Sequence, residues 1–125
     1  MFKSTNLPLA VVASLLFAAS GNAGTTFHVP GDFPTIQQAI LAASSGDTIL
    51  VDPGVYPEGP LNFGGKGLNV IGLDGAELTK ITMAVGASGS VINIRGGEDP
   101  VILSGFTITD GNGTNGRGGG IEIIG

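Results

Sequence analysis

The chain has 125 residues, no cysteine and a net charge of −5, which allows one small domain and excludes disulfides and cysteine-ligated zinc. Its 10 acidic residues outnumber the 5 basic ones, so it lacks the basic patch that attracts nucleic acid. Glycine is the extreme of the composition, with 23 residues. These glycines mostly separate short apolar segments, which indicates many tight turns rather than a flexible polymer.

Residues 1–23 have the pattern of a secretory signal peptide. Lys3 gives a basic start, Leu7–Ala19 is almost wholly apolar, and Gly21-Asn22-Ala23 offers small residues for cleavage. Because the apolar segment is shorter than the roughly 20 residues that cross a bilayer, a retained anchor is the weaker alternative. We expect a product secreted to the medium, the cell surface or the periplasm, without a membrane partner after cleavage. Residues 24–125 then form one domain.

A short capped helix is predicted from Ile36. Thr35 and Gln38 form a T-x-x-Q capping box, and Ser45-Gly46 marks the end of the helix. The apolar residues recur at helical spacing and form one narrow stripe, made of Ile36, Ala39, Ile40 and Ala43. Since so short a helix is unstable alone, we expect this stripe to cover an apolar column as a lid.

Short β-strands follow the helix. Each predicted strand has three to five residues rich in Ile, Val, Leu or Thr, and glycine-containing turns separate them. We expect the first ladder strand at Thr48–Val51. The later strands are predicted at Leu61–Phe63, Leu68–Ile71, Lys80–Met83, Val91–Ile94, Val101–Leu103, Phe106–Thr109 and Ile121–Ile124.

The strands recur with a period that indicates a solenoid. Apolar residues repeat at steps of 20 to 22 in two series, Leu61, Ile81, Val101 and Ile121, and Ile49, Val70 and Ile92. A repeat of this length built from short strands and turns is typical of stacked coils, each of which completes a buried apolar column.

Several motifs resemble one known family. After the helix come G-D-T-I-L-V, P-G-V-Y, L-N-V-I-G, V-I-L-S-G-F-T-I-T-D-G and G-G-G-I. In this order they resemble the N-terminal part of secreted proteins of the pectin-lyase-like superfamily. The resemblance implies an all-β fold, a right-handed parallel β-helix with an N-terminal capping α-helix. It implies no particular activity, because that superfamily includes polysaccharide lyases, hydrolases and esterases as well as adhesins.

The resemblance also predicts that the β-helix is truncated at its C-terminus. Family members usually have eight or more coils and a C-terminal cap, whereas residues 48–125 suffice for about three and a half coils of this period. We therefore expect further coils C-terminal to Gly125. Without them the last coil would expose unpaired backbone groups and apolar core.

Polysaccharide cleavage would require carboxylates as general acid and base or as calcium ligands. Asp47 and Asp52 flank a predicted strand, but both fit turns that aspartate favours for structural reasons. No two carboxylates recur as a spaced pair along one strand column. The sequence therefore predicts no catalytic residue and no cofactor site.

Tyr56 and Phe63 are the aromatic residues best placed to stack on a sugar ring, although corner packing explains Tyr56 better.

A weak calcium site is predicted between the last two strands. Asp110-Gly111-Asn112-Gly113-Thr114 offers oxygen ligands at positions one, three and five, as calcium loops do. The pattern then departs from such a loop, because Asn115 occupies the position of the glycine and Glu122 is displaced by one residue. The candidate ligands are Asp110, Asn112 and Glu122, and a long corner without metal is the ordinary alternative.

The expected function is that of an exported β-helix segment with a structural or carbohydrate-binding surface. Stacked parallel strands present a long flat face to a linear polymer, which favours extended polysaccharide as the partner. One alternative is the N-terminal fragment of a lyase, hydrolase or esterase acting on pectin-like acidic polysaccharide. A second alternative is a cell-surface protein similar to an adhesin.

Overall fold

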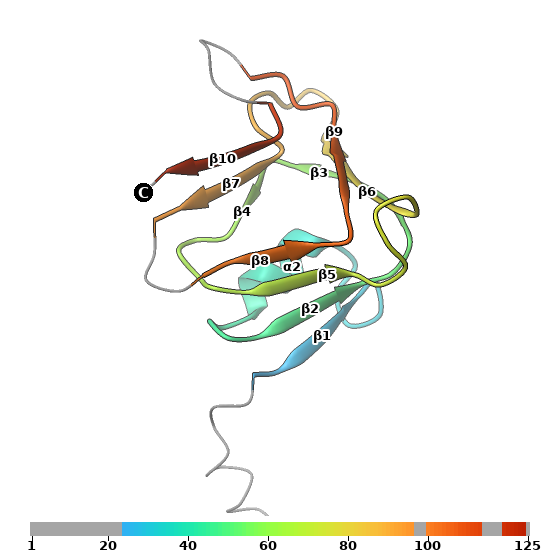
Figure 1. Cartoon of the computed structure of the whole chain (residues 1–125), viewed down its shortest axis with the longest axis vertical. Coiled ribbons are helices and arrows are strands. Elements are labelled where there is room, and N and C mark those ends of the chain that lie inside the picture. The colour runs from blue at the N-terminus through green and yellow to red at the C-terminus, as the bar shows by residue number, and fades with distance from the viewer. Residues whose placement is uncertain (1–23, 97–99, 114–118, 125) are drawn as a thin grey trace, which may run out of the picture.

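The computed structural model describes residues 24–96, 100–113 and 119–124. These residues form a parallel β-solenoid, or β-helix, of about four turns, with one short helix near the N-terminus (Figure 1). The predicted fold class is thus confirmed, whereas the predicted signal peptide lies outside the described residues. No helix in the described part is long and apolar enough to span a membrane.

The strands form three parallel sheets, and the chain visits them in the same order in each full turn. Sheet A contains β1 (Thr26–Val29), β2 (Thr48–Val51), β5 (Asn69–Gly72) and β8 (Ile102–Ser104). Sheet B contains β3 (Gly54–Gly59), β6 (Thr79–Met83) and β9 (Thr107–Thr109). Sheet C contains β4 (Leu61–Asn62), β7 (Ile92–Arg95) and β10 (Ile121–Ile124).

The first turn consists of β1 and the helix α2 (Ile36–Ala42). The helix contacts β1, β2, β3 and β4, so it covers the end of the solenoid below sheets B and C. The stripe predicted from the sequence is buried, because Ile36, Ala39, Ile40 and Ala43 all lie in the core. The prediction of a helical lid is therefore confirmed. β1 was not predicted, and it pairs with β2, so Thr48–Val51 is the second ladder strand rather than the first.

Both ends of α2 are held by residues of the following turn. The two carboxylate oxygens of Glu58 accept hydrogen bonds from the backbone N–H groups of Ile36 and Gln37, each at 2.9 Å. At the other end Lys66 Nζ donates to the carbonyl oxygens of Ile40 (2.9 Å) and Leu41 (3.0 Å). An anion at the N-terminus and a cation at the C-terminus both complement the helix dipole. Thr35 Oγ1 also accepts from the N–H of Gln38, as the predicted capping box requires.

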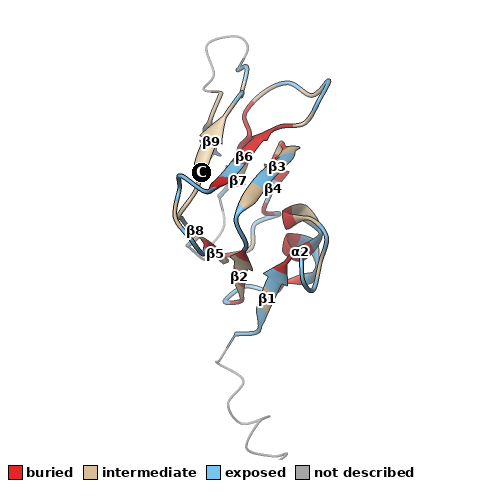
Figure 2. Cartoon of the chain, turned by 90° about the vertical axis from the view of Figure 1, so that its right-hand side faces the viewer, coloured by how far each residue is buried: buried red, intermediate tan, exposed pale blue. Residues whose placement is uncertain are grey.

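Inward-pointing residues of successive turns stack in columns. In sheet A, Ile49 pairs with Val70 and Val70 with Leu103. In sheet C, Leu61 pairs with Ile92 and Ile92 with Ile121. Figure 2 shows that buried positions are concentrated in the turns nearest α2, whereas β8 and β9 are of intermediate or full exposure.

The residues of the predicted 20-residue series do not form one stacked column, so this prediction is wrong. Leu61 and Ile121 lie in sheet C, Ile81 lies in sheet B, and Val101 precedes a strand of sheet A. In the second series Ile49 and Val70 do share a column, but Ile92 belongs to sheet C. The true offset varies, since Thr48 pairs with Asn69 and Asn69 with Ile102, which are steps of 21 and 33 residues. Corners of unequal length cause this variation, so a fixed period cannot describe the chain.

One corner requires glycine on two successive turns. Gly72 is the last residue of β5, and a Cβ atom built on it would clash with the backbone carbonyl of Gly105 in the next turn. Gly105 has φ 78°, in the left-handed region that side chains disfavour. The two turns therefore approach closely at this corner because neither residue has a side chain.

Candidate functional site

The residues predicted to bind calcium make local contacts in the structure. Asp110 has φ 66°, and its Oδ2 accepts a hydrogen bond from Thr109 Oγ1 at 3.1 Å. Asn112 bridges to Gly89, because its N–H donates to the Gly89 carbonyl (3.1 Å) and its Oδ1 accepts from the Gly89 N–H (2.9 Å). Glu122 lies on β10 beside Asn93 of β7.

The two hydrogen bonds to Gly89 give Asn112 a structural role, because they join its corner to the corner of the previous turn. Residues 114–118 of the predicted loop lie outside the described residues. Within the described ranges no three His, Asp or Glu side chains are grouped so as to hold a metal ion. Calcium binding by Asp110, Asn112 and Glu122 stays a prediction.

Asp47 has the structural role expected from its sequence context. It is buried, and its carboxylate oxygens accept from the N–H groups of Thr25 and Ser44, each at 2.8 Å. It thereby joins the start of β1 to the turn that follows α2. Asp52 contributes its backbone carbonyl to Tyr56, whose hydroxyl donates at 2.8 Å.

The two aromatic residues considered for sugar stacking are not on open surface. Phe63 is fully buried in the core, so the stacking prediction is wrong for this residue. Tyr56 lies on β3 and is half-buried against the core. Burial, reinforced by the nearby carboxylates of Asp52 and Glu58, raises the pKa of its phenol. These contacts explain Tyr56 as a packing residue that holds the corner between β2 and β3.

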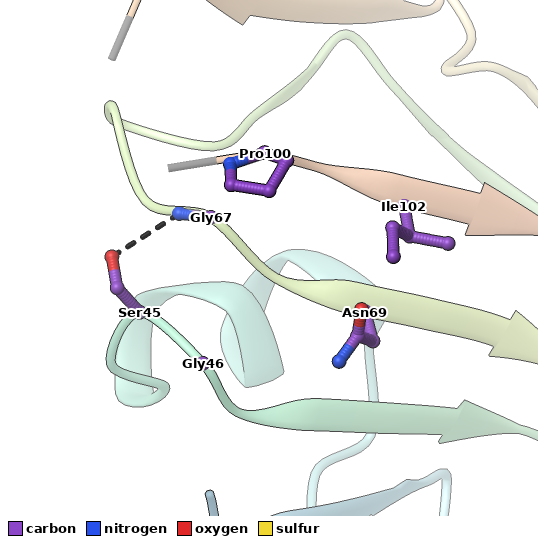
Figure 3. Close-up of a pocket in the computed structure, with 6 residues that line it drawn as sticks. All are labelled: Ser45, Gly46, Gly67, Asn69, Pro100 and Ile102. Carbon is purple, nitrogen blue, oxygen red and sulfur yellow. Dashed lines mark hydrogen bonds between the residues drawn. The ribbon is translucent and has the colours of Figure 1, made fainter. Parts of the chain in front are cut away.

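A shallow hollow of about 280 Å³ lies on sheet A, where the strands begin (Figure 3). Three successive turns contribute to it, and no single sequence motif marks it. Ser45 Oγ accepts from the N–H of Gly67 at 3.1 Å, which holds the first two of these turns together. The lining residues are Ser45, Gly46, Gly67, Asn69, Pro100 and Ile102.

A column of outward-pointing polar residues leads to the hollow. The register of sheet A aligns Thr26 with Thr48 and Thr48 with Asn69. The next residue of this column is Ile102, which is exposed on β8. Asn69 Nδ2 lies 3.4 Å from Thr48 Oγ1, so the two side chains contact each other along the axis of the solenoid. The surface thus combines hydroxyl and amide groups with the apolar side chains of Pro100 and Ile102.

A second polar column lies on the outer face of sheet C. Asn62 aligns with Asn93, and Asn93 aligns with Glu122. Arg95 is two residues beyond Asn93 on β7, so it points to the same face and is exposed. Sequence reasoning missed both columns because the repeat is irregular. The available signal was alternation, since the polar residues of the sheet A column directly precede an inward-pointing apolar residue in their strands, and those of the sheet C column directly follow one.

Comparison of the chain with family models, with curated proteins and with solved structures gives no match.

Proposed function

We propose that this chain belongs to an exported β-helix protein of the pectin-lyase-like kind, and that sheet A binds an extended carbohydrate. The observation that carries the proposal is the hollow at Asn69, into which the polar column of Thr26, Thr48 and Asn69 leads. Hydroxyl and amide groups each donate and accept hydrogen bonds, as sugar hydroxyls do. Ile102 and Pro100 offer apolar contact to the C–H groups of a sugar ring.

The shape of the surface favours a polymer over a compact ligand. Neighbouring strands lie about 4.8 Å apart, so a column of side chains presents polar groups at regular intervals along the solenoid. The hollow is shallow and opens onto this column, so an extended chain could contact several turns at once. No described carboxylate lines the hollow, which supports binding rather than cleavage at this surface.

Affinity measurements on soluble polysaccharides test the proposal. Titration calorimetry or affinity electrophoresis would compare neutral polymers such as xylan with polygalacturonate. Asn69→Ala should weaken binding by about tenfold, the effect expected for the loss of one or two hydrogen bonds. The matched control is Asn93→Ala, which removes the same half-buried side chain from the outer face of sheet C. Loss of binding in the control but not in Asn69→Ala would contradict the assignment to sheet A.

The second candidate function is cleavage of an acidic polysaccharide, and sheet C favours it. Glu122 and Arg95 share its outer face, so a carboxylate and a guanidinium lie on neighbouring strands. A guanidinium can grip a sugar carboxylate through two hydrogen bonds. Incubation with polygalacturonate, with and without calcium, would reveal unsaturated or reducing products if the chain is catalytic. Retention without products would favour binding, and neither retention nor products would favour an adhesive or structural surface protein.

A further inference from the structure

The hollow on sheet A is built from uncharged residues. Its polar side chains are those of Ser45 and Asn69, its apolar side chains are those of Pro100 and Ile102, and two glycines complete the lining (Figure 3). A ligand in the hollow therefore meets hydroxyl, amide and aliphatic groups, and no lining side chain carries a charge.

Both polar side chains of the hollow keep hydrogen-bonding groups for a ligand. Ser45 Oγ accepts from the N–H of Gly67, so its own O–H group can donate outward. Asn69 Nδ2 donates to Thr48 Oγ1 through a long contact of 3.4 Å, and this leaves the side-chain carbonyl oxygen Oδ1 as an acceptor. The hollow thus offers one neutral donor and one neutral acceptor, which sugar hydroxyls can pair with.

The basic side chains of the described ranges are engaged or located elsewhere. Lys66 directly precedes a lining glycine, but its Nζ donates to two backbone carbonyl groups at the end of α2. Lys80 lies on β6 of sheet B, and Arg95 lies on β7 of sheet C. Among the described residues, no lysine or arginine is therefore placed to pair with a sugar carboxylate in the hollow.

The ionisable residues nearest to the lining along the chain are mostly acidic. Asp47 lies two residues after Ser45 and is buried, with its carboxylate bonded to two backbone N–H groups. Glu98 and Asp99 directly precede Pro100 in the sequence, and the whole chain has a net charge of −5. An acidic polysaccharide would lose hydration at the hollow without gaining an ionic partner, and the negative charge of the protein would repel it.

The arrangement of the lining also distinguishes among neutral sugars. Pro100 and Ile102 come from the last of the three contributing turns, whereas Ser45 and Asn69 come from the two turns before it. A β-linked pyranose with equatorial hydroxyls has the same division, because its flat faces carry C–H groups and its rim carries the hydroxyls. An axial hydroxyl would place a polar group against the apolar part of the lining, where it lacks a partner.

We propose that the hollow binds a neutral β-linked polysaccharide with equatorial hydroxyls, of the glucan or xylan class, and discriminates against polymers of uronic acids. This inference rests on the function proposed above, because it concerns the same surface of sheet A. It assigns to sheet A a class of ligand different from the acidic polysaccharide considered for the outer face of sheet C.

Two soluble cellulose derivatives that differ in charge test the first part of the proposal. Titration calorimetry would compare hydroxyethyl cellulose, which is neutral, with carboxymethyl cellulose, which is anionic. At low ionic strength the neutral polymer should bind about tenfold more tightly or better, and the difference should shrink at high salt as the repulsion is screened. Equal or tighter binding of the anionic polymer would overturn the neutral assignment and leave carbohydrate binding intact.

A charge introduced at an exposed position tests whether the hollow is the site. Ile102→Lys places a cation in the lining at a residue that is 54% exposed, so the fold should tolerate it. The ratio of the two affinities should shift about fivefold toward the anionic polymer, the upper range for an exposed ion pair. Ile102→Gln is the matched control, since it adds a long polar side chain without charge and should leave the ratio unchanged. An unchanged ratio in Ile102→Lys would overturn the assignment to the hollow.

A pair of short oligosaccharides tests the preference for equatorial hydroxyls. Cellohexaose and mannohexaose share the β-linkage, but each mannose unit carries an axial hydroxyl. Cellohexaose should bind several times more tightly, and equal affinities would overturn this preference alone. If neither oligosaccharide binds, and neither the cellulose derivatives nor polygalacturonate bind, the function proposed above fails as well.

Discussion

The two ends of the solenoid differ in how far the apolar core is covered. At the α2 end, the core is closed by Ile36 and Ile40, which are 0% and 1% exposed. At the β8–β10 end, Ile121 and Ile123 point inward yet are 44% and 72% exposed. Both ends contain the same kinds of residue, so exposure depends on whether a covering element is present rather than on composition.

The α2 end also satisfies backbone groups that a bare end would leave unpaired. Gln37 donates from Nε2 to the carbonyl of Asn62 (3.1 Å) and accepts from its N–H (2.9 Å), so one side chain pairs with the free edge of β4. Glu58 and Lys66 secure the helix in return. A cap is thus a set of reciprocal hydrogen bonds over an apolar contact. Among the described residues, the β8–β10 end presents exposed apolar side chains with no helix packed over them.

The largest expected difference between the ends is the cost of a buried charge. Ile40→Asp should lower the free energy of unfolding by more than about 4 kcal/mol, because it places a carboxylate in the closed core. Ile123→Asp should change it by no more than about 0.5 kcal/mol, since this side chain is already in water. Urea denaturation followed by circular dichroism measures both. Equal losses would show that the second end is also closed in solution.

A milder comparison uses one column of sheet C. Ile92→Ala should cost about 2–5 kcal/mol, the usual range for truncating a fully buried isoleucine. Ile121→Ala, in register with it, should cost about half of that or less, because the residue is already 44% exposed. If a further coil is added to the chain, the cost at Ile121 should rise toward that at Ile92.

The reciprocal bonds of the cap give a smaller effect. Glu58→Gln should lower the free energy of unfolding by about 1–2 kcal/mol, because a neutral amide offers one acceptor where the carboxylate offers two. Glu77→Gln is the matched control, since Glu77 is exposed in a turn and should be close to neutral. A control as costly as Glu58→Gln would mean that overall charge, rather than the cap, accounts for the loss.

The smallest effect concerns Tyr56, the single tyrosine of the chain. Its pKa is raised above the usual 10.0, first by burial and then by Asp52 and Glu58. A raised pKa stabilises the fold at every pH below the unfolded value, and this contribution is lost as the pH rises through the folded value. Absorbance titration of the phenolate should show a midpoint above 10.0 that falls to the usual value in denaturant. An identical midpoint in both conditions would place Tyr56 in open solvent.

Local chemistry explains which parts of this molecule were predictable from sequence. The helix was found because Thr35, Gln38 and the apolar stripe obey short-range rules. Ile49 and Val70 were aligned because the turn of the solenoid between them is short, with an offset of 21 residues that matches the predicted period. β3 was missed because Gly54 and Pro57 are typical of turns, whereas here they lie on a strand with one covered edge. The sheet A hollow could not be predicted, since Asn69 and Ile102 become neighbours only after a full turn of the solenoid whose corners have unpredictable lengths.

Because the corners of the solenoid differ in length, insertions at the corners should be tolerated better than substitutions in the stacked columns. The offset between paired residues grows from 21 to 33 within sheet A, yet the strands remain in parallel register. Residues added to such a corner lengthen a surface loop and leave the stacked columns unaltered. New surface chemistry can therefore arise by insertion at the corners, while substitution inside the columns is restricted by packing. For protein engineering, the largely exposed corner between β5 and β6 (residues 73–78) is a suitable place to graft a peptide.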